Sequence, residues 1–253
     1  MKNPLLRSLA ILLVASVACV FPSYAITKQF AETYPLEAGG TFELQNVNGT
    51  VQVQGWDRNE VEVRAVKTAK DHEADLDRVS IEVDAKPKSI SVSTRYPQNE
   101  GVEVLVEYIV HVPHNSHVEH LSTVNGTLRI SGVSDVEDLH TVNGGIEVYE
   151  AGGDVKARTT NGNVRVELAS FRNTSGATAE TTNGSVVLAV PTDTQADLEA
   201  RCLNGNFLSE IPVSMEGGMK PREMHGRLGQ GGAPIRLRTV NGAIRVVALR
   251  STV

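Results

Sequence analysis

The sequence predicts an all-β protein: a single-stack β-solenoid, or β-helix-like repeat protein, with a less regular N-terminal β section. Three observations predict this class. The dipeptide Asn-Gly recurs in similar surroundings, apolar and polar residues alternate on both sides of it, and aromatic residues make up only 4% of the chain. With so few aromatics, Val, Leu, Ile and Ala must fill the core, and small aliphatic side chains suit a narrow interior in which like residues stack.

The first 25 residues have the pattern of a secretory signal peptide. Lys2 and Arg7 give a positive start, an apolar run follows over residues 9–21, and the small residues Ser23 and Ala25 form a cleavage site. The run is shorter than the roughly 20 apolar residues that cross a bilayer. We therefore expect cleavage after the first 25 residues and export to the periplasm or the cell surface.

Two alternatives to simple cleavage stay open, an uncleaved anchor helix and lipidation of Cys19. After cleavage the chain keeps 22 of its 24 Lys and Arg residues and all 30 Asp and Glu residues, so its net charge is −8. Such a charge predicts no nucleic-acid partner, and the mature chain contains no predicted transmembrane segment. Cys202 would be its only cysteine, which excludes an internal disulfide; it stands where Thr is usual in the repeat, so we expect a buried, unreactive thiol.

The Asn-Gly repeat is the strongest signal in the chain. Its spacings are 77, 18, 18, 22, 21 and 37 residues, within strings such as TVNGTLRI, TVNGGIEV and TTNGNVRV. The predicted structural turns are Asn48 and Gly49, Asn125 and Gly126, Asn143 and Gly144, Asn161 and Gly162, Asn183 and Gly184, Asn204 and Gly205, and Asn241 and Gly242.

Each repeat predicts strand, turn and strand. Around Asn143, for example, Leu139, Ile146 and Val148 are apolar and His140 and Glu147 are polar. This period of two is typical of half-buried strands, and no apolar set recurs at the helical spacing of three and four.

Two architectures can use this unit. Asn-Gly could close an antiparallel hairpin, or each repeat could form one coil of a solenoid with like residues about 4.8 Å apart. The 18-residue steps and the Thr two residues before most of the Asn residues favour the solenoid. We expect the Thr hydroxyls and the Asn amides to hydrogen-bond along the stack, and the Gly to accept a positive φ.

The predicted organisation is one continuous domain after the signal peptide, with an irregular β section over residues 26–113 and the Asn-Gly solenoid over residues 114–253. Strands of the irregular section are expected at 61–69, 80–85, 89–95 and 102–112. Between residues 211 and 233 the repeat breaks into Pro, Met and Gly. We expect a loop there, either a contact surface or a disordered insertion.

The run LSTVNGTLRISGVSDVEDLHTVNGGIEVYEAGGDVKARTTNGNVRVELAS (121–170) and GGAPIRLRTVNGAIRVV (231–247) resemble the bacterial putative-adhesin family. This family is a domain of unknown function with T-V-N-G β-strand repeats. The resemblance covers most of the mature chain and implies an exported or membrane-associated β-solenoid-like protein. It implies no catalytic residues and no cofactor.

Four histidines raise the question of a metal site. His111, His114, His117 and His120 stand three residues apart, and converging imidazoles bind zinc or copper. Residues three apart on a strand point to opposite faces, so we expect no metal site, with His114, His117 and His120 as the weak candidates.

The predicted function is a non-enzymatic, exported structural or adhesin-like envelope protein. Its repeat β surface would bind an unknown envelope protein or surface polymer. The alternative is a β-helix carbohydrate-active enzyme of the polysaccharide lyase or hydrolase type, which needs carboxylates grouped on one face. The repeat instead alternates charges, as at Arg129, Glu147 and Arg165, and contains no nucleophile-elbow motif.

Overall fold

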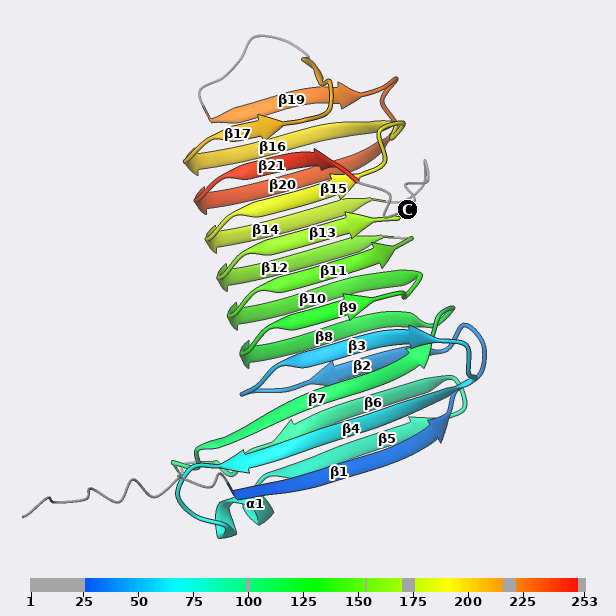
Figure 1. Ribbon diagram of the computed structural model, residues 1–253, viewed down its shortest axis with the longest axis vertical. Coiled ribbons are helices and arrows are strands. Elements are labelled where there is room, and N and C mark those ends of the chain that lie inside the picture. The colour runs from blue at the N-terminus through cyan, green and yellow to red at the C-terminus, as the bar shows by residue number, and fades with distance from the viewer. Residues whose placement is uncertain (1–25, 99–100, 153, 170–175, 216–221, 250–253) are drawn as a thin grey trace, which may run out of the picture.

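The computed structural model is an elongated stack of strands (Figure 1). It describes residues 26–98, 101–152, 154–169, 176–215 and 222–249. The predicted signal peptide and Cys19 lie outside these residues. The all-β class is confirmed, because two large mixed sheets and the five-residue helix α1 (Ala74–Arg78) contain all the regular structure described. The described chain contains no helix that is long and apolar enough to span a membrane.

The two sheets run side by side along the stack. In spatial order, the ten-stranded sheet contains β1 (Ile26–Pro35), β4 (Glu60–Ala69), β7 (Val104–Pro113), β3 (Val51–Trp56), β9 (Leu128–Ser131), β11 (Ile146–Ala151), β13 (Val164–Leu168), β15 (Val186–Val190), β21 (Ile244–Ala248) and β17 (Phe207–Ser209). The eleven-stranded sheet contains β18 (Ser214–Met215), β19 (Glu223–Leu228), β16 (Ala196–Asn204), β20 (Ala233–Asn241), β14 (Ala177–Asn183), β12 (Val155–Asn161), β10 (Asp135–Asn143), β8 (His117–Asn125), β2 (Thr41–Gln45), β6 (Ser89–Arg95) and β5 (Ser80–Lys86).

Each Asn-Gly repeat contributes one strand to each sheet, and we call this pair of strands a coil, named by its Asn. Neighbouring coils pair in parallel and in register, so that Thr141 lies between Thr123 and Thr159. Parallel pairing between coils confirms the stacked arrangement and excludes a hairpin at Asn-Gly. The two sheets are not closed, since each runs from one edge strand to another.

The coils do not follow the order of the sequence. The Asn241 coil, β20 and β21, lies between the Asn183 and Asn204 coils, as the red strands between yellow ones show in Figure 1. The Asn48 coil, β2 and β3, likewise lies between β6 and β7 on one side and the Asn125 coil on the other. Both the first and the last coil are therefore inserted into the stack.

Aliphatic side chains fill the interior, as the composition predicts. The inward positions of the repeats, such as Leu139, Ile146 and Val148, are fully buried. The two largest fully buried side chains, Phe42 and Tyr108, both lie in the N-terminal part. The alternation of period two thus defines the core of both sheets.

The N-terminal strands expected from the sequence are present as β4, β5, β6 and β7. Strand β1 was not predicted from the sequence, and it pairs antiparallel with β4 at the edge of the ten-stranded sheet. Only Ile26, Phe30 and Tyr34 of β1 pack against the core, and its other residues are exposed. Apolar residues four apart give no period-two signal, because every second inward position is polar.

Part of the segment between residues 211 and 233 forms strands where a loop was expected. Its residues 223–228 form β19, which pairs antiparallel with β16 and extends the eleven-stranded sheet. Met224, Gly226 and Leu228 are buried on alternate positions, so this strand follows the period-two rule without the Asn-Gly mark. The loop prediction is wrong for β19, because an antiparallel strand needs no repeat signature.

Candidate functional site

The Asn side chains of the seven turns form one exposed ladder along the corner between the sheets. Six of the seven Nδ2 groups donate to the Oδ1 of the next Asn at 2.7–2.9 Å, in the spatial order Asn204, Asn241, Asn183, Asn161, Asn143, Asn125 and, at the end, Asn48. An amide has two donor hydrogens and two acceptor lone pairs. The interior members of the ladder therefore still present a donor and an acceptor to solvent.

The Thr hydroxyls before the turns hydrogen-bond along the stack, but they do not bond to one another. Thr141 and Thr159 donate instead to the backbone carbonyls of Gly126 and Gly144 in the neighbouring coil, at 3.0 and 2.9 Å. Cys202 takes the same place in its coil, and its Sγ contacts the Gly242 carbonyl at 3.1 Å. Burial raises the pKa of the Cys202 thiol, which disfavours the reactive thiolate.

The turn glycines are required by a close backbone approach more than by a positive φ. A Cβ on Gly144 would lie 1.9 Å from the carbonyl oxygen of Gly126, and one on Gly162 would lie 1.9 Å from that of Gly144. Among the seven turns only Gly49, Gly184 and Gly242 have a positive φ. The expected reason for Gly is therefore corrected: coils 18 residues apart pack so closely that a side chain has no room.

The three candidate histidines have separate partners. His117 Nδ1 lies 3.0 Å from Asp135, and His120 Nδ1 lies 3.2 Å from Asp138. His114 contacts the Gly132 carbonyl through Nδ1. In the part of the chain that the structure describes, no three His, Cys, Asp or Glu side chains come together as a metal site requires. The candidates His114, His117 and His120 thus each face a different partner.

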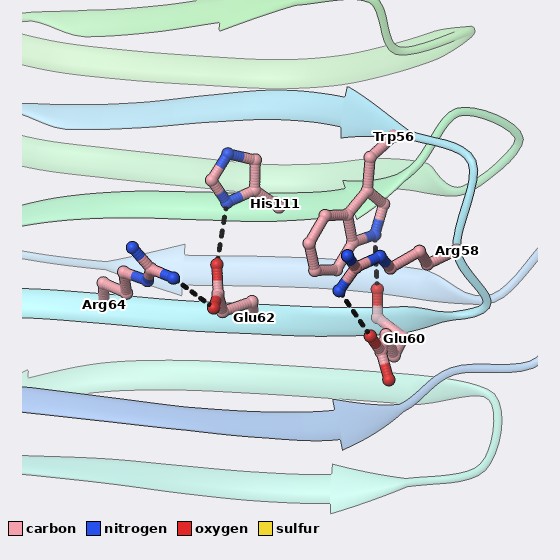
Figure 2. A network of polar contacts seen from close by, with 6 residues as sticks. All are labelled: Trp56, Arg58, Glu60, Glu62, Arg64 and His111. Carbon is pink, nitrogen blue, oxygen red and sulfur yellow. Dashed lines mark hydrogen bonds and ion pairs between the residues drawn. The ribbon is translucent and has the colours of Figure 1, made fainter.

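His111 belongs to a polar network that sequence reasoning missed (Figure 2). Its ring stacks on Trp56 with a centroid distance of 5.0 Å, and its Nδ1 lies 3.1 Å from Glu62. The guanidinium of Arg58 lies 4.8 Å from the centroid of the Trp56 ring. Trp56 is the only Trp in the sequence, and this was the sequence feature that could have pointed to the network.

This network closes the turn between β3 and β4 rather than forming an open platform. Trp56 Nε1 donates to the Glu60 carbonyl at 2.8 Å, and Arg58 pairs with Glu60 at 3.4 Å. Arg64, and to a smaller extent His111, hold the pKa of Glu62 below its ordinary value. The indole contacts both Arg58 and His111, so it is not free to stack on a sugar ring.

The outer face of the eleven-stranded sheet is a lattice of paired charges. Glu180 pairs with Arg158 at 3.0 Å and with Arg238 at 3.8 Å, and Arg238 also reaches Glu199 at 3.3 Å. The carboxylates of Glu180 and Glu199 are therefore already paired with arginines of neighbouring strands.

Two cavities lie near the N-terminal end of the repeats. The larger, about 580 Å³, has mainly apolar walls that include Val102, Val104 and Leu105, and reaches Asn48 and Asn125. The smaller, about 200 Å³, is acidic and is lined by Thr41, His117, Val118, Glu119, Asp135 and Glu137. Neither cavity could be placed from the sequence, because both form where non-consecutive strands meet.

The in-register ladder, the open sheets and the paired charges define an all-β repeat protein of the class expected from the TVNG motif. A family model described as Toastrack DUF4097 matches residues 115–247, more than half of the chain. The chain therefore belongs to the Toastrack DUF4097 family, and its resemblance to the bacterial putative-adhesin family is confirmed.

Solved structures similar to the chain include a putative cell adhesion protein from Clostridium sporogenes, with a TM-score of 0.53 and 14% identity over 88% of this chain and 100% of that chain. A putative adhesin from Bacteroides fragilis has a TM-score of 0.36 and 10% identity, over 88% of this chain and 97% of that chain. The first similarity shows a shared fold alone. No curated protein matches the chain.

Proposed function

We propose that the protein is an exported, non-enzymatic, adhesin-like envelope protein with a solenoid-like repeat surface that binds a surface polysaccharide. One observation carries the proposal: the amide ladder repeats one unused donor and one unused acceptor along the corner. A polysaccharide offers hydroxyl groups at a similarly regular spacing, which can pair with both. The name of one structural neighbour, a putative cell adhesion protein, agrees with an adhesin-like role.

The residue before each Asn completes this corner surface. It is aliphatic or Thr in every coil and includes the exposed side chains Val124, Thr160, Thr182, Val240 and Leu203. A row of small apolar groups beside a row of amides matches the mixed character of a sugar ring, which has polar edges and apolar C–H faces. The sheet faces suit a partner less well, because their charges already pair with each other.

The first experiment locates the mature, tagged protein by fractionation of native cells and by protease treatment of intact cells. Accessibility to external protease supports an adhesin role. Protection inside the periplasm overturns contact with an external surface and directs the search to periplasmic polymers and envelope proteins.

The second experiment measures binding of the purified protein to isolated envelope polysaccharides. The double variant Thr160→Lys, Thr182→Lys places two bulky charges on the exposed corner and is expected to reduce binding at least several-fold. The matched control is Thr27→Lys, Thr33→Lys, which adds the same charges to exposed positions of the edge strand β1. Equal binding by both variants would refute the corner as the binding surface.

A polysaccharide lyase or hydrolase is the second candidate function, and the acidic cavity is the observation that favours it. Glu119 and Glu137 line this cavity together with Asp135, and paired carboxylates carry out acid–base chemistry on glycans. Release of new chain ends from an envelope polysaccharide, abolished by Glu119→Gln or Glu137→Gln, would replace the non-enzymatic proposal.

A further inference from the structure

The Asn-Gly sequence is chemically labile as well as structurally useful. The backbone nitrogen of the Gly can attack the side-chain carbonyl carbon of the Asn, and Gly hinders this attack less than any other residue because it has no Cβ. Asn is accordingly among the thermolabile residues of proteins. Seven Asn-Gly pairs in one exposed corner therefore need protection.

Six of the seven pairs are protected by the next coil. The Gly backbone nitrogen donates to the Asn carbonyl of the neighbouring coil at 2.8–3.1 Å, which occurs at Gly49, Gly126, Gly144, Gly162, Gly184 and Gly242. The Asn side chains of the same six pairs accept a hydrogen bond from the next Asn in the ladder. Attack at any of these turns requires the Gly nitrogen to leave its carbonyl partner and the Asn side chain to rotate out of the ladder, which breaks both hydrogen bonds.

Asn204 and Gly205 lack this protection because the Asn204 coil is the last Asn-Gly coil in the spatial order of the ladder. Beyond its strand β17 the ten-stranded sheet has no further strand. Among the described residues, none accepts a hydrogen bond from the Gly205 nitrogen and none donates to Asn204 Oδ1. Gly205 is also exposed, whereas the other six turn glycines are buried or half-buried.

We propose that Asn204 is the site of spontaneous deamidation in this protein. The Gly205 nitrogen loses its proton and bonds to Cγ of Asn204, and the Nδ2 group leaves as ammonia, which gives a cyclic succinimide. Water then opens either C–N bond of the ring. The products are Asp at position 204 or its isoaspartyl isomer, and no oxidant or reductant is involved.

Deamidation changes the end of the stack in two ways. A carboxylate at position 204 can no longer donate to Asn241 Oδ1, the 2.8 Å bond that joins the last coil to the ladder. The isoaspartyl product also adds a backbone atom just before β17, which pairs Phe207 with Ile244 and Ser209 with Val246. We expect the last coil to detach from β21 as the protein ages.

The test is peptide mapping by mass spectrometry after the folded, full-length mature protein has been incubated at mildly alkaline pH. Asn204 is expected to deamidate roughly tenfold faster than any other Asn-Gly pair, because each of the others loses two hydrogen bonds on opening. The same chain in denaturant is expected to deamidate at all seven pairs at similar rates. Equal rates in the folded protein, or a faster reaction at Asn143, would overturn the proposal.

Ammonia release gives an independent measurement. Asn204→Gln keeps an amide but requires a larger ring, so early ammonia release is expected to fall to the background of the other sites. The matched variant Asn143→Gln is expected to leave it unchanged. Unchanged early release from Asn204→Gln would refute Asn204 as the labile site.

Discussion

The N-terminal section and the Asn-Gly coils fill the same narrow interior with different chemistry. In the coils, small aliphatic side chains stack and each corner adds one Thr–Gly and one Asn–Asn hydrogen bond. In the N-terminal section, Tyr108 is 1% exposed and shares a buried hydrogen-bond network with Thr94 and Asn46, at 2.7 and 2.9 Å from Thr94. Burial raises the pKa of Tyr108 to about 12. Stability is therefore spread over many equal contributions in one region and concentrated in one network in the other.

The largest expected effect tests whether stability in the N-terminal section is concentrated in the Tyr108 network. Tyr108→Ala removes the largest fully buried side chain and leaves Thr94 without its phenol partner, so we expect a loss of about 4 kcal/mol of unfolding free energy. Chemical denaturation measures the change. Tyr108→Phe, which keeps the ring, is the control and is expected to cost about 1 kcal/mol. Equal losses for both variants would show that the hydroxyl rather than packing dominates.

The next effect tests how closely the coils pack. Gly144→Ala places a Cβ 1.9 Å from a backbone carbonyl that cannot rotate away, so the coils must separate locally at a cost of about 3 kcal/mol. Gly101→Ala is the control, because a Cβ there meets nothing within 4 Å, and its effect is expected to stay within about 0.5 kcal/mol. Similar midpoints for the two variants would contradict the close approach.

A smaller effect compares one hydroxyl from each region. Thr94→Val removes a group that bridges Asn46 and Tyr108, so about 2 kcal/mol is expected, since two buried partners lose a hydrogen bond. Thr159→Val removes one bond to a single carbonyl in the repeat and is expected to cost about 1 kcal/mol. A larger loss from Thr159→Val would mean that the repeat corner acts as a cooperative unit.

The smallest effect is electrostatic and lies on the outer face. The folded pKa of Glu62 is lowered from 4.5 by Arg64 and, less, by His111. Its stabilising contribution is therefore fully present above pH 4.5 and is lost as pH falls through the lower folded value. Denaturation midpoints of the protein and of Glu62→Gln are expected to converge as pH is lowered from 6 toward 3. Parallel curves over this range would show that Glu62 does not contribute to the pH dependence of stability.

The sequence was sufficient to predict the repeated strands and their stacking. It was insufficient to predict the order of the coils and the strands at the ends of the stack. Period-two alternation around each Asn-Gly predicts the strands and their stacking, because like residues at like positions pair in register. The same pattern does not predict the order of the coils. Thr239 and Thr181 occupy the same position in their repeats, and only the structure shows that their strands are neighbours. β1 and β19 were missed for a related reason: antiparallel strands at the ends follow no repeat.

The same distinction between repeated and non-repeated features applies to the candidate sites. The Asn ladder was predictable because stacked amides hydrogen-bond wherever coils are in register. The Trp56 network was not, because it joins β3, β4 and β7 through contacts between residues far apart in the sequence. The separate carboxylate partners of His117 and His120 follow from strand register, which places Asp135 and Asp138 one coil away.

The insertion of the last coil has a mechanical consequence. β21 is held on both sides, by β15 and β17, so a force that pulls on the C-terminus must shear two parallel strand pairs at once. β1 has a single partner, β4, and a force on the N-terminus can peel it away one residue pair at a time. A molecule tethered by its C-terminal end would resist tension at the interior of its stack, while the same tension applied to the N-terminal end would unravel it from the edge.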